Sequence, residues 1–319
     1  MKVILIETKN GTSINNVTGR ARRVEGRSAQ VSVNGPINGE VVSVSTIGKE
    51  DLTYAEIARQ GIILHVLQGR TSLLSHPFFQ RIWLPHERTS WPEDGRTLRP
   101  FIYFPGRALN LSQEMAVEKI VSSDDDNRMV MIHGPPGTGK TTVIAAAVTS
   151  LHLADHERSV WIAAQSNVAV KNIAEKLCDV GFHDFKLLVS KDFHFDWCVR
   201  FSSKLLCLMT SNRHEHLYGD ILQASFIRSD NFNKDIVGAA RQLLDARVIL
   251  CTLTMLSNPS IAAYTRIAPV HTVMFDEASQ IEVGDYIPVI HRFSSTLRKF
   301  VFIGDNKQRS SLSSPTTSG

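Results

Sequence analysis

The apolar positions are spaced differently before and after about residue 105. In the first part, short β-branched runs at residues 3–6, 29–33 and 41–44 are separated by stretches rich in glycine, proline and asparagine. Such runs between turn residues are typical of strands. The pattern predicts a small β-rich accessory module, for which a barrel is one possible form, followed by a helix near residues 54–60.

After residue 105 the pattern changes to apolar strands that alternate with helices. A run at residues 129–132 leads through a glycine-rich turn into a helix over residues 140–151, and Val170, Ile173 and Leu177 share one face of a second helix. Further strands are expected at residues 160–164, 247–253, 272–275 and 300–303, and helical stretches near Leu205 and residues 238–244 within a less regular region from 185 to 245. Apolar strands joined through helices predict an α/β fold with a parallel sheet covered by helices on both faces.

The changes in pattern predict three segments. These are the β-rich module with a linker over residues 1–105, the α/β domain over residues 106–308, and a Ser/Thr-rich tail over residues 309–319. A tail of that composition, without periodicity, is expected to be disordered.

Composition narrows the class of protein without assigning a function. Of the 319 residues, 43% are apolar and 21% are charged, as in ordinary globular proteins. No apolar run is long enough to span a bilayer and the start has no signal-peptide core, so we expect no membrane association. Four cysteines without a CxxC pair favour reduced thiols in an intracellular protein, either cytoplasmic or nuclear. The formal net charge of +4 permits a nucleic-acid partner but does not require one.

The strongest chemical signal is the sequence GPPGTGKTT, which matches GxxxxGK[ST] between a predicted strand and a predicted helix. Its residues are Gly134, Pro135, Pro136, Gly137, Thr138, Gly139, Lys140, Thr141 and Thr142. In such a loop the backbone amides and the helix N-terminus face the phosphates of ATP. Lys140 would reach the β and γ phosphates, and the Thr141 hydroxyl would bind Mg²⁺. The alternative is a glycine-rich turn ahead of a helix, without a ligand.

A second signal is the pair Asp276 and Glu277 at the end of an apolar strand. Asp276 can hold Mg²⁺, and Glu277 can accept the proton of an attacking water. An acidic pair at a strand end is often only a solvated cap. Downstream of a P-loop in an alternating fold, it predicts the second half of the nucleotide site.

Several further blocks resemble superfamily 1 helicases, in the branch of the nonsense-mediated decay helicase, the immunoglobulin mu-binding helicase and senataxin. In addition to the P-loop, the matching blocks are LNLSQEMAV at residues 109–117, AQSNVAV at 164–170, CTLT at 251–254, DEASQ at 276–280 and GDNKQ at 304–308. They occur in the family's order over residues 109–308. The resemblance implies a RecA-like P-loop fold, a β-barrel as the counterpart of the N-terminal module, and ATP hydrolysis with Mg²⁺ coupled to translocation on single-stranded RNA or DNA.

The same resemblance implies roles for individual residues. Gln113 would read the adenine edge, Gln280 and Gln308 would sense the γ-phosphate, Ser166 and Asn167 would lie along the nucleic-acid strand, and Thr252 and Thr254 would contact its phosphates. From the residues alone, capping of the next helix explains Ser166 or Asn167 equally well. The β-rich module is a candidate binding surface for protein partners. The sequence does not distinguish RNA from DNA and does not give the oligomeric state.

The last residues depart from the family pattern. Relatives continue after GDxxQ with LPP and a second RecA-like domain, whereas this chain reads QRSSLSSPTTSG over residues 308–319. The second domain supplies arginines, and an arginine finger is worth about 10³–10⁵ in rate in other phosphoryl-transfer systems. The expectation is therefore a first motor domain that binds ATP and hydrolyses it slowly.

Two other classes of function stay open. One is a nucleotide-dependent binding or regulatory protein without motor activity. The other is a P-loop ATPase that acts on something other than nucleic acid, with its arginine supplied by a neighbouring subunit. Stimulation of turnover by nucleic acid separates the helicase interpretation from this last class.

Overall fold

A computed structural model gives the fold of the chain. It describes residues 3–10, 13–25, 28–47, 52–84, 89–92, 101–191, 221–222 and 224–305. The chain divides into two compact units, Met1–Thr53 and Tyr54–Gly319. Each is described by itself. Among the described residues, no helix has the length and apolar character that crossing a bilayer requires.

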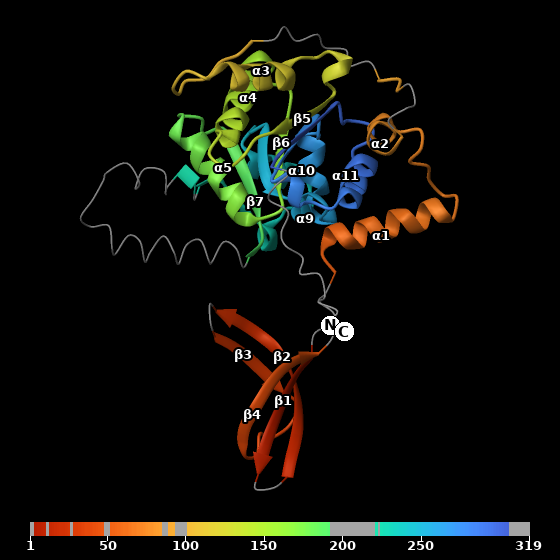
Figure 1. Ribbon diagram of the computed structural model, residues 1–319, viewed down its shortest axis with the longest axis vertical. Coiled ribbons are helices and arrows are strands. Elements are labelled where there is room, and N and C mark those ends of the chain that lie inside the picture. Colours follow the sequence, from red (N-terminus) through yellow and green to blue (C-terminus); the bar gives the residue numbers. More distant parts are fainter. Residues whose placement is uncertain are drawn as a thin grey trace, which may run out of the picture. The chain divides into compact units, whose positions relative to one another are not determined.

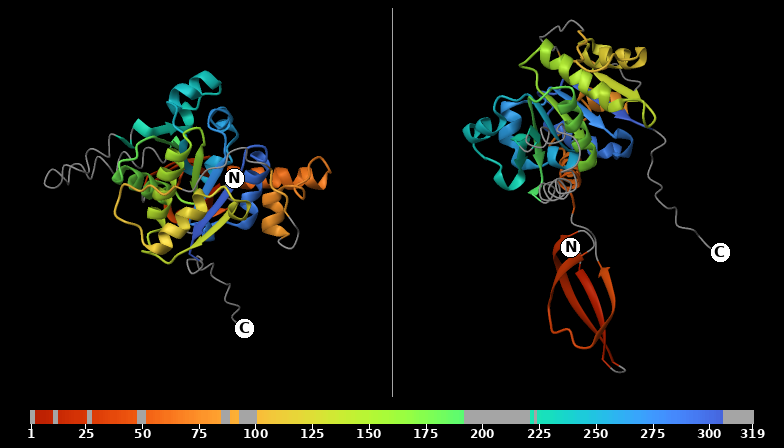
Figure 2. Two further views of the ribbon diagram at one scale, coloured as in Figure 1. Left: turned by 90° about the horizontal axis from the view of Figure 1, so that it is seen from above. Right: turned by 90° about the vertical axis from the view of Figure 1, so that its left-hand side faces the viewer.

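The first unit is a four-stranded antiparallel sheet, drawn in red in Figure 2. Its strands are β1 (Val3–Asn10), β2 (Ser13–Glu25), β3 (Ser28–Val33) and β4 (Glu40–Ile47). They lie in the order β3-β2-β1-β4, so β3 and β4 are edges and the described strands form an open sheet. Ile4 and Ile6 alternate with more exposed positions along β1 and are buried, which is the period of two expected for a strand with one covered face.

The second unit is a seven-stranded parallel sheet covered by helices, and its β-strand order is β5-β11-β10-β6-β9-β7-β8. In chain order its helices and strands are α1 (Tyr54–Leu67), α2 (Pro77–Trp83), α3 (Leu111–Val121), β5 (Met129–His133), α4 (Lys140–Ala154), β6 (Val160–Ala164), α5 (Asn167–Asp179), β7 (Phe185–Val189), β8 (Phe226–Arg228), α8 (Ile236–Leu243), β9 (Val248–Thr252), α9 (Leu253–Leu256), α10 (Ala262–Ile267), β10 (Thr272–Asp276), α11 (Ile287–Arg292) and β11 (Lys299–Gly304).

The two faces of this sheet bury two separate apolar clusters. Val160 and Ile162 of β6 belong to the cluster under α3, α4 and α5. Trp161 and Ala163 belong to the cluster under α8, α9, α10 and α11. Figure 1 shows α3, α4 and α5 on one side of the sheet and α9, α10 and α11 on the other. Because every residue of β6 is buried, the strand is apolar along its whole length.

The α/β fold with a parallel sheet and a small β-rich module is confirmed. The structure adds two strands to the region from 185 to 245, β7 and β8, where the sequence suggested little regularity. Lys186 interrupts the apolar run of β7, and its ammonium is held by the carbonyl of Ala224 at 3.3 Å. The helical stretch expected near Leu205 lies outside the described residues.

The helices α1 and α2 belong to the second unit, so the small sheet occupies only the first half of residues 1–105. Helix α1 contacts α9, α11 and the 3₁₀ turn Val283–Tyr286. Arg59 of α1 forms ion pairs with Glu282 at 2.7 Å and Asp285 at 2.9 Å. Phe78 of α2 is buried against Phe300 of β11, with ring centroids 5.5 Å apart.

Candidate nucleotide site

The glycine-rich loop joins the carboxyl end of β5 to the start of α4, and its glycines have conformational reasons to be glycine. Gly137 and Gly139 have φ values of 81° and 86°, which side chains with a Cβ avoid. A Cβ on Gly134 would lie 2.6 Å from Thr138 Oγ1. The loop is therefore shaped so that its amides and the N-terminus of the 15-residue helix α4 can face an anion.

Lys140 lies against the inside of this loop. Its ammonium donates hydrogen bonds to the carbonyls of Gly134 at 2.7 Å and Pro135 at 3.2 Å. The Thr138 hydroxyl donates to Pro135 as well, at 2.8 Å. Pro135, Pro136, Gly137 and Thr138 are exposed, Thr141 is half-buried and Thr142 is buried. The Lys140 ammonium is thus held by carbonyl groups of a loop whose middle residues are exposed.

The two carboxylates stand at the end of β10. Asp276 is only 8% exposed, and its Oδ1 accepts a hydrogen bond from the amide of Glu277 at 2.9 Å. Burial raises the pKa of Asp276, and the amide of Glu277 and the charge of Lys140 act in the opposite direction. In the strand order β5-β11-β10, the loop after β5 and the carboxylates at the end of β10 lie at the same end of nearby parallel strands, so the predicted phosphate-binding and metal-binding residues share one site.

The donor chemistry of this site fits Mg²⁺. The candidate ligands Thr141 and Asp276 supply a hydroxyl and a carboxylate oxygen, and Mg²⁺ in nucleotide sites is commonly held by few protein oxygens together with phosphates and water. Burial makes the negative charge of Asp276 costly in the ligand-free protein. A divalent cation beside it would offset that cost.

Gln113 connects α3 to the loop. Its side chain and the amide of Gln113 form a capping box with Asn110, and its Nε2 donates to the carbonyl of Thr138 at 3.0 Å. The motif implies only an adenine contact for Gln113, so the contact with Thr138 was not expected. The pattern Asn-x-x-Gln ahead of an apolar helix is a signal that could have predicted the capping box.

The end of β11 forms the third wall of the site. The carbonyl of Gly304 accepts a hydrogen bond from the amide of Gly134 at 3.1 Å. A Cβ on Gly304 would lie 3.0 Å from the amide nitrogen of Ser279, so this glycine allows close approach of the turn after Glu277. Gln280 ends that turn and is exposed. Gln308 lies outside the described residues.

The candidate nucleic-acid contacts lie at the ends of the two next strands, β6 and β9. Ser166 and Thr252 each cap the following helix, accepting hydrogen bonds from the amides of Ala169 at 3.1 Å and Met255 at 3.2 Å. Ser166 also donates to Glu277 Oε2 at 3.1 Å. The capping interpretation of Ser166 is therefore confirmed, and its hydroxyl has a second contact that the sequence did not reveal. Asn167 and Thr254 are half-buried in the first turns of the same helices.

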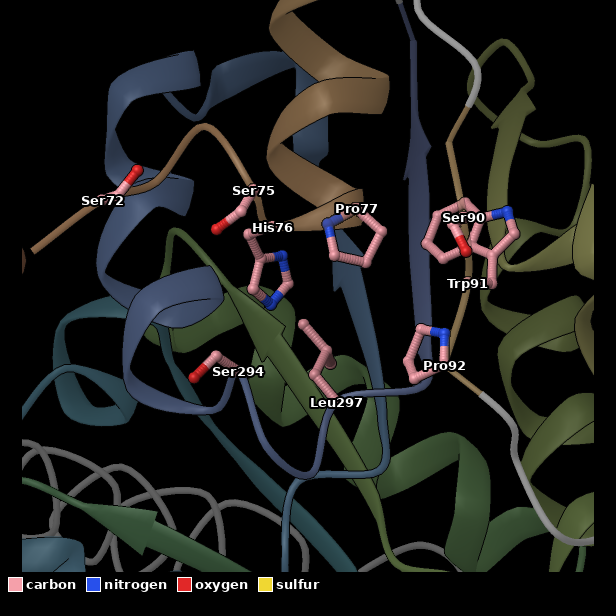
Figure 3. A pocket seen from close by; sticks show the side chains of 9 residues that line it. All are labelled: Ser72, Ser75, His76, Pro77, Ser90, Trp91, Pro92, Ser294 and Leu297. Atoms are coloured by element: carbon pink, nitrogen blue, oxygen red, sulfur yellow. The ribbon is translucent and has the colours of Figure 1, made fainter.

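A pocket of about 490 Å³ lies near the amino end of β11, the opposite end of that strand from the nucleotide site. Its lining residues are Ser72, Ser75, His76, Pro77, Ser90, Trp91, Pro92, Ser294 and Leu297 (Figure 3). Ser294 and Leu297 precede the first residue of β11, whereas Gly304 is its last. The pocket is therefore separate from the nucleotide site.

Comparisons with known proteins give the family of the chain. A family model described as "AAA domain" matches residues 108–192 and 210–312. DNA polymerase alpha-associated DNA helicase A of Saccharomyces cerevisiae is 26% identical over 267 residues, covering 75% of this chain and 38% of that protein. Regulator of nonsense transcripts 1 of Caenorhabditis elegans is 29% identical over 214 residues, covering 63% of this chain and 18% of that protein. ATP-dependent helicase upf1 of Schizosaccharomyces pombe is 27% identical over 217 residues, covering 63% of this chain and 22% of that protein.

These relatives are much longer than the part that is shared. The chain spans between about a fifth and about two fifths of their lengths. The two segments that the family model matches contain residues 134–142 and the pair Asp276 and Glu277.

Proposed function

The chain belongs to the AAA domain family and, within it, to the superfamily 1 helicases of the nonsense-mediated decay type, and we propose that it is the ATP-binding motor domain of an RNA or DNA helicase. The observation that carries the proposal is that Gly304, at the end of β11, touches both motifs: its carbonyl accepts a hydrogen bond from the amide of Gly134 at 3.1 Å, and a Cβ on it would lie 3.0 Å from the amide nitrogen of Ser279, in the turn after Glu277. The proposed reaction is hydrolysis of ATP, coupled to movement on a single strand of nucleic acid.

Each residue of the proposed site is given a role. Lys140 binds the β and γ phosphates, while Thr141 and Asp276 hold Mg²⁺, which neutralises charge on the phosphates. The amides of the loop and the N-terminus of α4 bind the remaining phosphate oxygens. Glu277 is the proposed general base for the attacking water. Gln113 is the proposed adenine contact, and Gln280 and Gln308 the proposed sensors of the γ-phosphate.

The single strand is proposed to cross the ends of β6 and β9. Ser166, Asn167, Thr252 and Thr254 lie at these ends, which are neighbours because Ala164 and Thr252 pair in register. Hydroxyls and helix N-terminal amides contact phosphates without reading bases. This path would serve RNA or DNA alike, in an intracellular protein of the cytoplasm or nucleus.

The proposal is tested by ATP binding to the full chain in the presence of Mg²⁺, measured by calorimetry. Lys140→Ala should weaken ATP binding by about 10- to 100-fold, since a hydrogen bond to a charged group contributes about 1.5–3 kcal/mol. The matched control is Lys234→Ala, which removes an exposed lysine ahead of α8. Unchanged affinity in Lys140→Ala, or an equal loss in both variants, would rule out the assigned phosphate site.

A further inference from the structure

In the proposed function, the carboxyl ends of the strands of the large sheet carry two groups of functional residues. The strands β5, β11 and β10 carry the nucleotide residues, and β6 and β9 carry the proposed strand contacts. The two groups meet where β10 lies beside β6, with Asp276 opposite Ala164 in register. A residue that joins the two sides of this boundary can transmit the presence of a strand to the nucleotide.

A side-chain hydrogen bond from Ser166 Oγ to Glu277 Oε2, at 3.1 Å, crosses this boundary. The Ser166 oxygen also accepts the amide of Ala169 at 3.1 Å. A serine hydroxyl can donate only one hydrogen bond, and in this arrangement Glu277 accepts it. The backbone of Glu277 has φ 53°, a conformation that non-glycine residues adopt only where the surroundings hold them in it.

The strand order gives the direction of this contact. The P-loop follows β5, on the side of β10 that faces away from β6. A hydrogen bond to Ser166 therefore draws the carboxylate of Glu277 toward β6 and away from the loop. The oxygen that accepts it has one lone pair fewer for the proton of an attacking water.

We propose that Ser166 is a positioning residue that restrains Glu277 while no strand is bound and releases it when a strand phosphate accepts the hydrogen bond of the Ser166 hydroxyl in its place. This inference rests on the proposed function, because it needs Glu277 as the general base and a strand at β6. It adds a coupling mechanism: the hydroxyl that contacts the strand is the same one that holds the base. Hydrolysis would then wait for the strand.

The test compares three substitutions at Ser166 in the full chain. Ser166→Gly and Ser166→Ala both remove the hydroxyl, but glycine is a much better helix N-cap than alanine. Ser166→Thr keeps both the hydroxyl and the cap. The rate of a single turnover of radiolabelled ATP, which can be followed even when hydrolysis is slow, is measured with and without an oligouridylate or oligothymidylate.

Ser166→Gly and Ser166→Ala should each raise the rate without a strand by about tenfold, a change of ~1.4 kcal/mol in the barrier. Their rates with saturating strand should stay near that of the wild type, so that the stimulation ratio falls by the same factor. Ser166→Thr should keep the wild-type ratio. A lost cap alone would make Ser166→Ala less active than Ser166→Gly and would not raise the rate in either variant.

The control for a lost cap is Asp235→Ala, because Asp235 caps α8 by accepting the amide of Gly238 at 2.7 Å. It should leave the stimulation ratio unchanged. Wild-type stimulation in Ser166→Gly overturns the inference and leaves the proposed function intact, provided that Glu277→Gln abolishes turnover. If no variant hydrolyses ATP faster than Glu277→Gln, then the proposed catalysis fails, and the inference with it.

Discussion

The side-chain amide of Gln113 donates a hydrogen bond to the carbonyl of Thr138 at 3.0 Å, so the first turn of α3 is tied directly to the phosphate-binding loop. The oxygen of the same side-chain amide accepts a hydrogen bond from the backbone amide of Asn110 at 3.0 Å. Gln113 thus supports the loop in addition to its proposed contact with adenine. These two roles make different predictions.

Gln113→Ala should weaken ATP binding more than GTP binding, by about 2- to 10-fold, because one hydrogen bond contributes about 0.5–1.5 kcal/mol. Gln113→Glu keeps the capping box but places a carboxylate oxygen against the carbonyl of Thr138, and should weaken both nucleotides. Competition binding with a fluorescent nucleotide measures the two affinities. Equal losses of ATP and GTP affinity in Gln113→Ala would show that Gln113 supports the loop and does not contact adenine.

Gly139→Ala should destabilise the protein and weaken ATP binding. A residue with a Cβ at a left-handed φ costs about 1–2 kcal/mol, and here the new Cβ would also lie 2.5 Å from Gln113 Nε2. Gly181→Ala is the matched control, because Gly181 has φ 76° and no atom within 4 Å of its Cβ position. Chemical denaturation should show that both variants lose unfolding free energy because alanine is strained at a left-handed φ. ATP affinity should fall only in Gly139→Ala. An equal effect of both on affinity would contradict the contact.

Asp276→Asn should raise the melting temperature of the nucleotide-free protein and reduce the stabilisation by ATP and Mg²⁺. Burial raises the pKa of the Asp276 carboxyl group, so its negative charge is costly in the folded protein, and the substitution removes that charge. It also removes a proposed metal ligand. Saturating ligand stabilises a protein by about 2.7 kcal/mol at a concentration of 100 times Kd, so the loss is visible by thermal denaturation. Asp235→Asn, at an exposed helix cap, should keep the full shift. A full shift in Asp276→Asn would show that Asp276 does not hold the metal.

The packing of α2 should weaken at mildly acidic pH through His76. Burial of the ring, and next the nearby His291, lower the pKa of His76, while the backbone of Ser294 raises it. Because the folded state favours the neutral ring, the stability that this residue contributes is present above the ordinary pKa of 6.5 and is lost as the pH falls through the lowered value. Thermal melts across this range should show a smaller loss of stability in His76→Gln than in the wild type. Identical pH profiles would refute this assignment.

Much of the large unit could be predicted because central strands such as β6 and β10 are buried on both faces. The run of β6, residues 160–164, is bounded in the structure as the sequence suggested. The strand expected to end at Leu253 ends instead at Thr252, since the hydroxyl of Thr252 accepts the amide of Met255 and starts α9 there. Local side-chain capping of this kind competes with the extended backbone.

The parts that could not be predicted depend on contacts between distant residues. Arg59 and Glu282 are 223 positions apart, and their ion pair helps to hold α1 on the large unit. Ser166 and Glu277 are 111 positions apart. Each of these two was recognisable as a motif residue, but their hydrogen bond follows from β6 lying next to β10, which no pattern along the chain encodes.

The central claim is that Lys140, Asp276 and Glu277 form an ATP-hydrolysing site that responds to nucleic acid. The most direct test is the rate of ATP hydrolysis by the wild-type chain and by Glu277→Gln, each with and without a single-stranded oligonucleotide. The account predicts strand-stimulated hydrolysis in the wild type and a rate lower by about 10²–10⁴-fold in Glu277→Gln, the usual contribution of a general base, with ATP binding retained. Equal rates in the two proteins, or a wild-type rate that no strand of RNA or DNA changes, would contradict it.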